Sequence, residues 1–214
     1  MLLIFLKLLE MNEIHNQISE YYASKIKEFG PIPQGVDWNS AESQELRFEV
    51  LSNLIQEQEH FSILDFGCGF GSMFAYFNAK YNSFEYIGFD VAEEMIIAAL
   101  NKFPKQENAK WTTSLPTRKT DYVIASGIFN VKLENSDEDW LNYILETLKK
   151  IDEYSIKGFS FNVLTTYSDA AYMKDYLYYA DPSILFDYCK KNFSKNVALL
   201  HDYNLYEFSI IVRK

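Results

Sequence analysis

The chain has 214 residues, is 48% hydrophobic and carries a net charge of −10, from 20 basic and 30 acidic residues. This composition favours one α/β domain with a sizeable core, and the acidic balance without a basic block argues against a nucleic-acid partner. The two cysteines, Cys68 and Cys189, lie far apart and form no CxxC or Cys/His cluster, which predicts a reduced, cytoplasmic protein without structural zinc.

The N-terminal segment begins with the apolar run MLLIFLKLLE, which Lys7 interrupts and which is too short to span a bilayer. We interpret residues 1–10 in one of two ways: either the start site is assigned too far upstream and the protein begins at Met11, or these residues form a loose helical leader. Apolar residues at three- and four-residue steps then predict a helix from about Glu13 to Lys27. The loop FGPIPQGVDWNS follows, and Ser40 caps a second predicted helix, so residues 1–60 are expected to form a helical cap or lid.

Predicted strands and helices alternate through the rest of the chain. Strands are expected at 60–66, 84–90, 109–113, 121–129 and 157–164, and helices at 72–81, 92–103, 137–154 and 183–193. Ser136 caps the third of these helices, and Asp181 before Pro182 opens the fourth. Residues 196–214 read as two extended runs joined at Asn204, too close together for a crossover helix, so the last strand should be antiparallel. The pattern predicts a Rossmann-like, doubly wound, seven-stranded and mostly parallel sheet over residues 61–214, within a single domain overall.

The segment SILDFGCGFGSM places a glycine-rich turn between the first strand and its helix. Gly67, Gly69 and Gly71 allow a close approach of backbone to a ligand, which in such sheets binds outside the carboxyl ends of the strands. Asp90 ends the next strand 19 positions after Gly71 (90 − 71), a spacing typical of an acidic residue that binds a ribose hydroxyl. The sequence therefore predicts a ligand that contains adenosine.

The turn differs from a dinucleotide site in two ways. Its spacing is GxGxG rather than GxGxxG, with Ser72 in the place of the third glycine, and Asp65 precedes the first glycine by two residues. A carboxylate there repels a pyrophosphate and attracts an ammonium group. No Gly-Lys-Ser/Thr sequence of a Walker loop occurs. S-adenosylmethionine has a ribose, an ammonium and a sulfonium but no phosphate, and it matches both carboxylates.

ILDFGCGFGSM and YIGFDVAEEM together resemble motif I and the acidic-strand motif of class I S-adenosylmethionine-dependent methyltransferases, and DYVIASGIFNV resembles that family's fourth strand. The resemblance covers roughly Phe61 to Lys214. It implies a set of cofactor-binding residues around the turn and the strand ends that follow: Asp65, Gly67, Cys68 and Gly69 at the methionine end, Asp90 on the ribose, Val91, Ser114 and Leu115 near the adenine, and Ser126 after the fourth strand. Ser114 stands where many members carry an aspartate.

EYYASKIKEFGPIPQGVDWNSAESQELRF resembles the N-terminal segment of small methyltransferases of bacterial capsule and surface-glycan biosynthesis, including those that O-methylate capsule phosphoramidate. This resemblance implies four residues that close over the cofactor, with Arg47 meeting its carboxylate. They are Tyr22, Trp38, Gln44 and Arg47. It also implies a small-molecule acceptor such as a nucleotide-linked sugar or a phosphoramidate.

If the acceptor is a sugar hydroxyl, a general base helps, and Asp37, His201 and His15 are candidates; an ionised phosphoramidate oxygen requires none. The three histidines do not have metal-ligand spacing, so a metal-independent reaction is expected. Two alternatives remain open at this point. One is a nicotinamide-linked oxidoreductase or epimerase, and the other is a non-catalytic partner subunit that binds S-adenosylmethionine. The sequence does not determine the oligomeric state.

Overall fold

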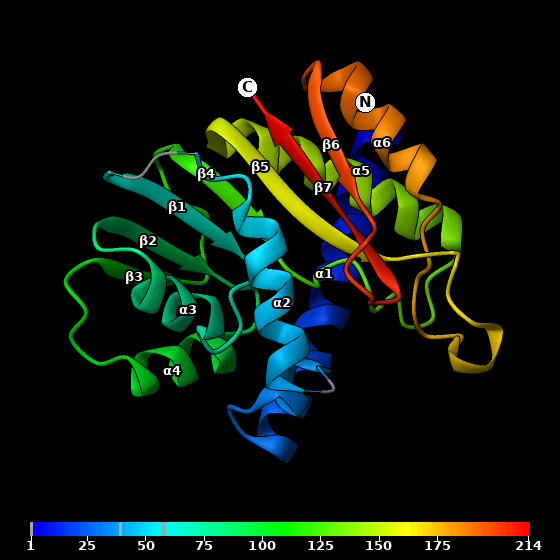
Figure 1. Ribbon diagram of the computed structural model, residues 1–214. Coiled ribbons are helices and arrows are strands. Elements are labelled where there is room, and N and C mark those ends of the chain that lie inside the picture. Colours follow the sequence, from blue (N-terminus) through cyan, green and yellow to red (C-terminus); the bar gives the residue numbers. More distant parts are fainter. Residues whose placement is uncertain (1, 39, 57–58) are drawn as a thin grey trace.

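A seven-stranded sheet forms the centre of the molecule, in the order β3-β2-β1-β4-β5-β7-β6 (Figure 1). The computed structural model describes residues 2–38, 40–56 and 59–214, with residues 2–12 described by their backbone only. The strands are β1 (Phe61–Phe66), β2 (Phe84–Phe89), β3 (Ala109–Thr112), β4 (Thr120–Ala125), β5 (Ser155–Leu164), β6 (Asn196–Leu200) and β7 (Glu207–Arg213). Strand β7 is antiparallel to both neighbours, and the other neighbouring pairs are parallel. The predicted Rossmann-like sheet is confirmed.

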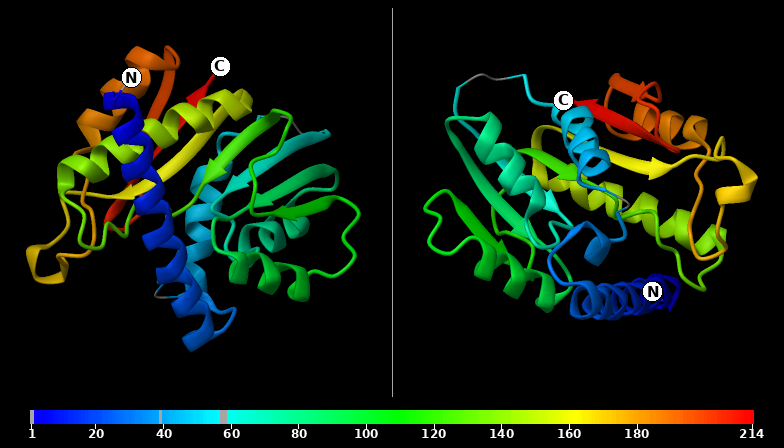
Figure 2. Two further views of the ribbon diagram at one scale, coloured as in Figure 1. Left: turned by 180° about the vertical axis from the view of Figure 1, so that it is seen from behind. Right: turned by 60° about the horizontal axis from the view of Figure 1, so that its bottom comes forward.

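Helices cover both faces of this sheet (Figures 1 and 2). They are α1 (Leu2–Phe29), α2 (Ala41–Ser52), α3 (Ser72–Lys80), α4 (Glu93–Lys102), α5 (Asp137–Tyr154) and α6 (Pro182–Asn192), with short 3-10 helices η1 (Pro33–Val36) and η2 (Ala170–Tyr172). Buried residues of α1, α5 and α6 join one core cluster with β1, β4 and β5, and those of α2 and α3 join a second cluster on the opposite face.

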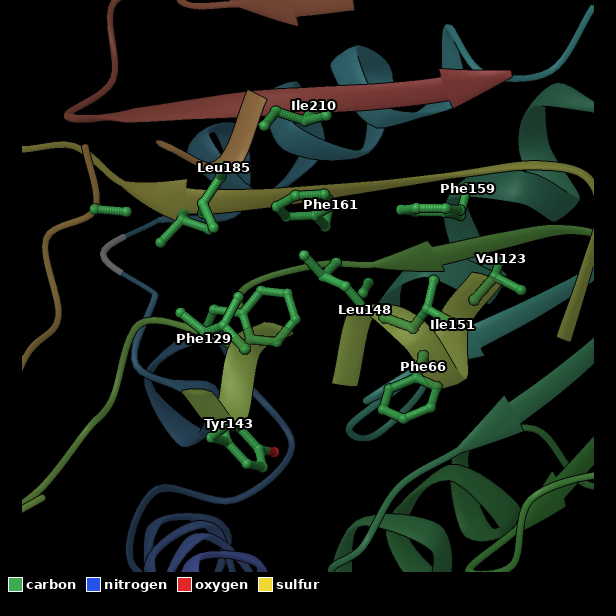
Figure 3. Packing of buried hydrophobic residues seen from close by; sticks show 14 of the residues in the cluster. Phe66, Val123, Phe129, Tyr143, Leu148, Ile151, Phe159, Phe161, Leu185 and Ile210 are labelled. Carbon is green, nitrogen blue, oxygen red and sulfur yellow. The ribbon is translucent and has the colours of Figure 1, made fainter. Parts of the chain in front are cut away.

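The larger core cluster lies between the sheet and α5 (Figure 3). Leu148 and Ile151 project from α5 toward Val123 of β4 and Phe159 of β5, and all four side chains are fully buried. The spacing of the apolar residues in 137–154 is therefore explained by one buried face of this helix. This packing fixes the carboxyl ends of β1, β4 and β5 relative to one another.

Three helices begin at the cap residues that the sequence predicts. The side chain of Ser40 accepts a hydrogen bond from the backbone N–H of Ser43, and that of Ser136 accepts one from Asp139. Asp181 accepts from the N–H of Ser183, with proline at the first helical position of α6. These caps set where the helices start.

Two predicted boundaries are wrong. The first helix starts at Leu2 rather than near Glu13, because the leucine-rich residues before it are good helix formers. Strand β4 ends at Ala125 rather than at 129, because Gly127 has a left-handed backbone with φ of 75° and donates its N–H to the Asn162 side chain instead of to a strand.

For the N-terminal residues, the sequence prediction can be compared with the backbone alone. The backbone of α1 is continuous from Leu2 to Phe29, and the side chains of residues 2–12 lie outside the described part, as does Met1. The interpretation of residues 1–10 as an overcalled start or a leader stays a prediction. Within the described residues, no helix combines the length and the apolar character needed to cross a membrane.

Candidate cofactor and active site

The glycine turn after β1 adopts the backbone that its sequence predicts. Gly67, Gly69 and Gly71 have φ values of 85°, 52° and 85°, a region that residues with a side chain rarely occupy. A Cβ on Gly67 would lie 2.2 Å from Cγ2 of Ile128, so glycine is also required there for space. The backbone N–H groups of Gly67 and Cys68 both donate to the carbonyl of Phe89 at the end of β2, at 2.8 and 2.9 Å. The turn is thereby attached to the neighbouring strand.

Asp90, which follows the end of β2, also stabilises this turn. One carboxylate oxygen accepts from the N–H of Gly69 at 2.8 Å, and the other accepts from the N–H of Ala92 at 2.9 Å. Burial raises the pKa of Asp90 to about 6, although these backbone N–H groups act to lower it. Each oxygen keeps a second lone pair, so the carboxylate can still bind a ligand hydroxyl.

Asp65 is the second acidic group of the site and is 1% exposed. Burial raises its pKa to about 7; the hydrogen bond from the Tyr86 hydroxyl opposes this shift, and the charge of Asp90 adds to it. No cationic side chain contributes to the shift in the pKa of Asp65. Asp65 and Asp90 therefore form an acidic pair that a bound cation stabilises in the ionised form.

A cavity opens at the carboxyl ends of β1, β2 and β4, and ten of the predicted cofactor residues line it. They are Tyr22, Trp38, Gln44, Asp65, Gly67, Cys68, Gly69, Asp90, Val91 and Ser126. Among the described lining residues, only the two aspartates have side chains that gain or lose a charge near neutral pH. Burial also raises the pKa of the Cys68 thiol well above its usual value, which agrees with a small turn residue rather than a nucleophile.

S-adenosylmethionine fits this lining on three observations. The acidic pair suits its ammonium and sulfonium groups, whereas a pyrophosphate would meet two carboxylates with no cationic side chain among the described lining residues. The glycine turn lacks the side chains that would fill the space. The hydroxyl oxygen of Ser126 is buried without a hydrogen-bond partner in the described structure, so it is available to a ligand.

Three predicted cofactor residues lie elsewhere. Arg47 Nε is bonded to Glu207 Oε2 at 2.7 Å, within a buried ion pair, and Arg47 does not line the cavity. Its guanidinium is directed to Glu207 because that carboxylate is itself buried and needs a partner. Ser114 and Leu115 line a separate depression beside β2 and β3, because the 113–119 connection runs along the sheet there.

None of the three candidate bases lines the cavity. Asp37 precedes the lining residue Trp38, and its carboxylate accepts from the Tyr21 hydroxyl at 2.5 Å and pairs with Lys25 Nζ at 2.9 Å. His15 lies behind Tyr143, with ring centres 5.6 Å apart, and burial lowers its pKa. His201 is exposed beside Tyr167 and is separated from the cavity. Within the described residues, no group of histidine, cysteine and acidic side chains could hold a metal ion.

Sequence reasoning missed the apolar and aromatic part of the lining. Those residues come from α1, η1, α2, the glycine turn, α3, α4, the turn after β4 and α5, and include Ile18, Val36, Phe48, Phe70, Met73, Met95, Ile128 and Tyr143. The periodicity of α5 identifies Tyr143 as a residue of its buried face, but it does not distinguish a core residue from a cavity wall.

Comparisons with known proteins agree with this site. The family described as "Methyltransferase domain" matches residues 63–150, which contain the glycine turn and Asp90. A Mycobacterium tuberculosis protein named as a methyltransferase, Rv1506c, is 49% identical over 162 residues, or 75% of this chain and 98% of that protein. The chain therefore belongs to the class I S-adenosylmethionine-dependent methyltransferases. It is an enzyme whose cofactor is S-adenosylmethionine, and this membership replaces both the nicotinamide-linked and the non-catalytic alternatives.

Solved structures of methyltransferases share the fold. The structure of DhpI in complex with SAH aligns with a TM-score of 0.66 at 12% identity, over 94% of this chain and 96% of that one. Magnesium protoporphyrin IX methyltransferase from Synechocystis PCC 6803 aligns with a TM-score of 0.59 at 15% identity, over 81% and 84%. At these identities the likeness shows the fold alone.

We expect this methyltransferase to bind S-adenosylhomocysteine more tightly as the pH rises from about 5 to about 8, because only ionised carboxylates attract the ammonium of the ligand. The raised pKa values, about 7 for Asp65 and about 6 for Asp90, define that range. Calorimetric titration at several pH values measures the effect. An affinity that stays constant over the range would contradict the role of the acidic pair.

The ligand-free protein should respond to pH in the opposite direction. In the unfolded chain these carboxyl groups lose their protons near the usual pKa of 3.8, whereas the folded protein retains them up to the raised values. The folded state thus binds more protons between about pH 4 and 7, so its stability should fall as the pH rises through that range. Thermal unfolding without ligand, set beside the Asp65→Asn variant, isolates the contribution of Asp65 to this pH dependence.

Proposed function

We propose that the protein transfers a methyl group, without a metal ion, to an oxygen of a small-molecule acceptor in bacterial surface-polysaccharide biosynthesis, in the cytoplasm. The observation that supports it best is the acidic, otherwise uncharged lining of the cavity at the ends of β1, β2 and β4. The resemblance of the segment around Trp38 and Gln44 to small capsule methyltransferases supports the glycan assignment.

The cofactor contacts follow from where each lining residue lies. Asp65 at the end of β1 would bind the ammonium group, and Asp90 at the end of β2 would bind the ribose, with Val91 beside the adenine. Gly67, Cys68 and Gly69 would contact the methionine part through their backbone. In the same proposal, residues 1–60 form a cap over a core of residues 61–214, and Tyr22, Trp38 and Gln44 provide the contacts of that cap with the ligand.

When bound, S-adenosylmethionine supplies a methyl group that is already activated by the sulfonium. The protein then has to hold an acceptor oxygen in line with that methyl group, so orientation contributes much of the rate. Of the three candidate bases, Asp37 is the best placed, because it adjoins Trp38 at the cavity and its carboxylate is oriented by Tyr21 and Lys25. Since Asp37 does not line the cavity, a sugar hydroxyl would donate its proton to this carboxylate only from an acceptor bound at the rim beside Trp38.

The charge of the lining bears on the choice of acceptor. An anionic acceptor, such as a phosphoramidate or the phosphate part of a nucleotide-linked sugar, would meet Asp65 and Asp90 with no cationic side chain among the described lining residues. A neutral sugar hydroxyl avoids this repulsion. The neutral hydroxyl is therefore the preferred acceptor group, and any phosphate is expected to remain outside the cavity.

Calorimetric titration with S-adenosylhomocysteine, beside NAD on the same preparation, tests the cofactor. We expect binding of S-adenosylhomocysteine alone; binding of NAD alone would overturn the assignment of Asp65. A mass-spectrometric assay with S-adenosylmethionine and a panel of neutral sugars, nucleotide-linked sugars and phosphoramidates then tests the acceptor. A gain of one methyl group on a sugar hydroxyl supports the proposal, and methylation of phosphoramidates alone would contradict the preference for a neutral acceptor.

A further inference from the structure

Trp38 contacts both a guanidinium group and a glycine. The guanidinium carbon of Arg47 lies 4.1 Å from the centre of the indole ring. A Cβ on Gly127 would lie only 2.3 Å from Cζ2 of the indole, so the ring rests against the glycine backbone. Trp38 and Gly127 both line the cavity, whereas Arg47 does not. The indole is thus a part of the cavity wall that both Arg47 and Gly127 contact.

Arg47 is itself fixed in orientation. Its Nε donates to Glu207 Oε2 at 2.7 Å, and Nη1 donates to the backbone carbonyl of Ser43 at 2.8 Å. The side chain of Arg47 is 10% exposed and that of Glu207 is fully buried. Because the guanidinium is planar, bonds at two of its nitrogens determine the direction of its face, which here is toward Trp38.

The glycine under the indole is fixed as well. The backbone N–H of Gly127 donates to Asn162 Oδ1 at 2.8 Å, and its φ of 75° requires glycine. Gly127 follows the end of β4, and β1, which carries Asp65, lies between β4 and β2. A ligand with its ribose at β2 and its ammonium at β1 therefore presents its methyl group toward the end of β4, beneath Trp38.

We propose that Trp38 is the cover of the cavity at the end where the methyl group leaves, and that Arg47 and Glu207 are positioning residues that hold this cover in place. The assignment rests on the methyl-transfer function proposed above. One measurement distinguishes this positioning role from direct binding of the cofactor by Arg47. If Arg47 acts through the indole, replacing Arg47 has no effect on ligand release once the indole has been removed.

Release of radiolabelled S-adenosylhomocysteine, chased with excess unlabelled ligand and followed by rapid filtration, measures this dependence in every variant, because it does not rely on tryptophan emission. Arg47→Lys keeps the charge but loses the planar face, and it should release the ligand about tenfold faster than the wild type. Trp38→Ala should have a similar effect, and the double variant should be no faster than Trp38→Ala alone. Gly127→Ala, which puts a Cβ against the ring and strains the backbone while retaining both members of the ion pair, should also release the ligand faster than the wild type. Trp38→Phe should restore most of the slow release, because it keeps an aromatic face.

Tryptophan fluorescence provides a second, independent measurement. The chain has three tryptophans, and of these Trp38 alone belongs to the described lining of the cavity. The fluorescence change on binding of S-adenosylhomocysteine should therefore be lost in Trp38→Phe. Arg118→Lys is a matched control, because Arg118 forms an exposed ion pair with Glu85 away from the cavity. Its release rate should equal that of the wild type.

Two results would overturn the positioning role. Release at the wild-type rate in Arg47→Lys and Gly127→Ala would show that the cover does not retain the ligand. A further acceleration by Arg47→Lys in the Trp38→Ala background would show that Arg47 contacts the ligand directly. If Arg47→Lys fails to fold, Glu207→Gln provides the same comparison. A wild type that does not bind S-adenosylhomocysteine would remove the proposed function too, whereas binding with unaltered release removes the positioning role alone.

Discussion

Replacing Asp90 with alanine is expected to weaken binding of S-adenosylhomocysteine about ten- to a hundredfold. If Asp90 binds the ribose as proposed, the variant loses a buried hydrogen bond to a charged group, which contributes roughly 1.5–3 kcal/mol. It also frees the backbone N–H groups of Gly69 and Ala92, which the two carboxylate oxygens hold at 2.8 and 2.9 Å, so the turn becomes less ordered. Calorimetric titration gives the change in Kd.

Asp90→Asn separates the two contributions. Asparagine keeps one acceptor oxygen for the turn but removes the charge, so its thermal stability should stay closer to that of the wild type than the stability of the alanine variant. Its affinity for the ligand should still fall. An unchanged Kd in both variants, with the fold intact by circular dichroism, would remove Asp90 from the cofactor site.

Replacing Arg47 with methionine is expected to lower the free energy of unfolding by about 3–5 kcal/mol, the range measured when one partner of a buried ion pair is removed. The variant leaves the fully buried Glu207 carboxyl group without the guanidinium that is bonded to its Oε2. Because burial already raises the pKa of Glu207, the carboxyl group should take up a proton in the variant. Urea denaturation at neutral pH measures the loss.

The double variant Arg47→Met/Glu207→Leu is the matched control. Removing the second charge leaves two apolar side chains in place of the pair, and such replacements are often neutral or stabilising. We therefore expect the double variant to regain most of the lost stability. If the double variant is no more stable than Arg47→Met, the destabilisation arises from lost packing of the long arginine side chain rather than from the unpaired carboxylate.

Local patterns were sufficient to predict the sheet and half of the binding site. The alternation of strands and helices, the caps at Ser40 and Asp181, and the spacing from the glycine turn to Asp90 each involve residues close in sequence. Their geometry follows from backbone preferences and from the arrangement of parallel strands. These signals need no knowledge of the remaining chain.

The rest of the site depends on contacts between distant residues. Arg47 was assigned to the cofactor carboxylate, but its partner is Glu207, 160 positions away, and nothing in the sequence around Arg47 indicates this pair. The position of Trp38 on Gly127 is equally non-local. The end of β4 was misplaced because Ile128 and Phe129 extend the run of strand-forming residues, and only the folded arrangement shows that Asn162 accepts the N–H of Gly127.

The hydrogen bonds that Asp90 accepts also determine how much this part of the protein has to reorganise when the ligand binds. Because the N–H groups of Gly69 and Ala92 already have partners, they should exchange slowly with deuterium even in the free protein. Little conformational entropy then remains to be lost in this segment on association. The floor of the site is preorganised, and encounter with the ligand should leave its exchange rates nearly unchanged, while the segment around Trp38 becomes more protected.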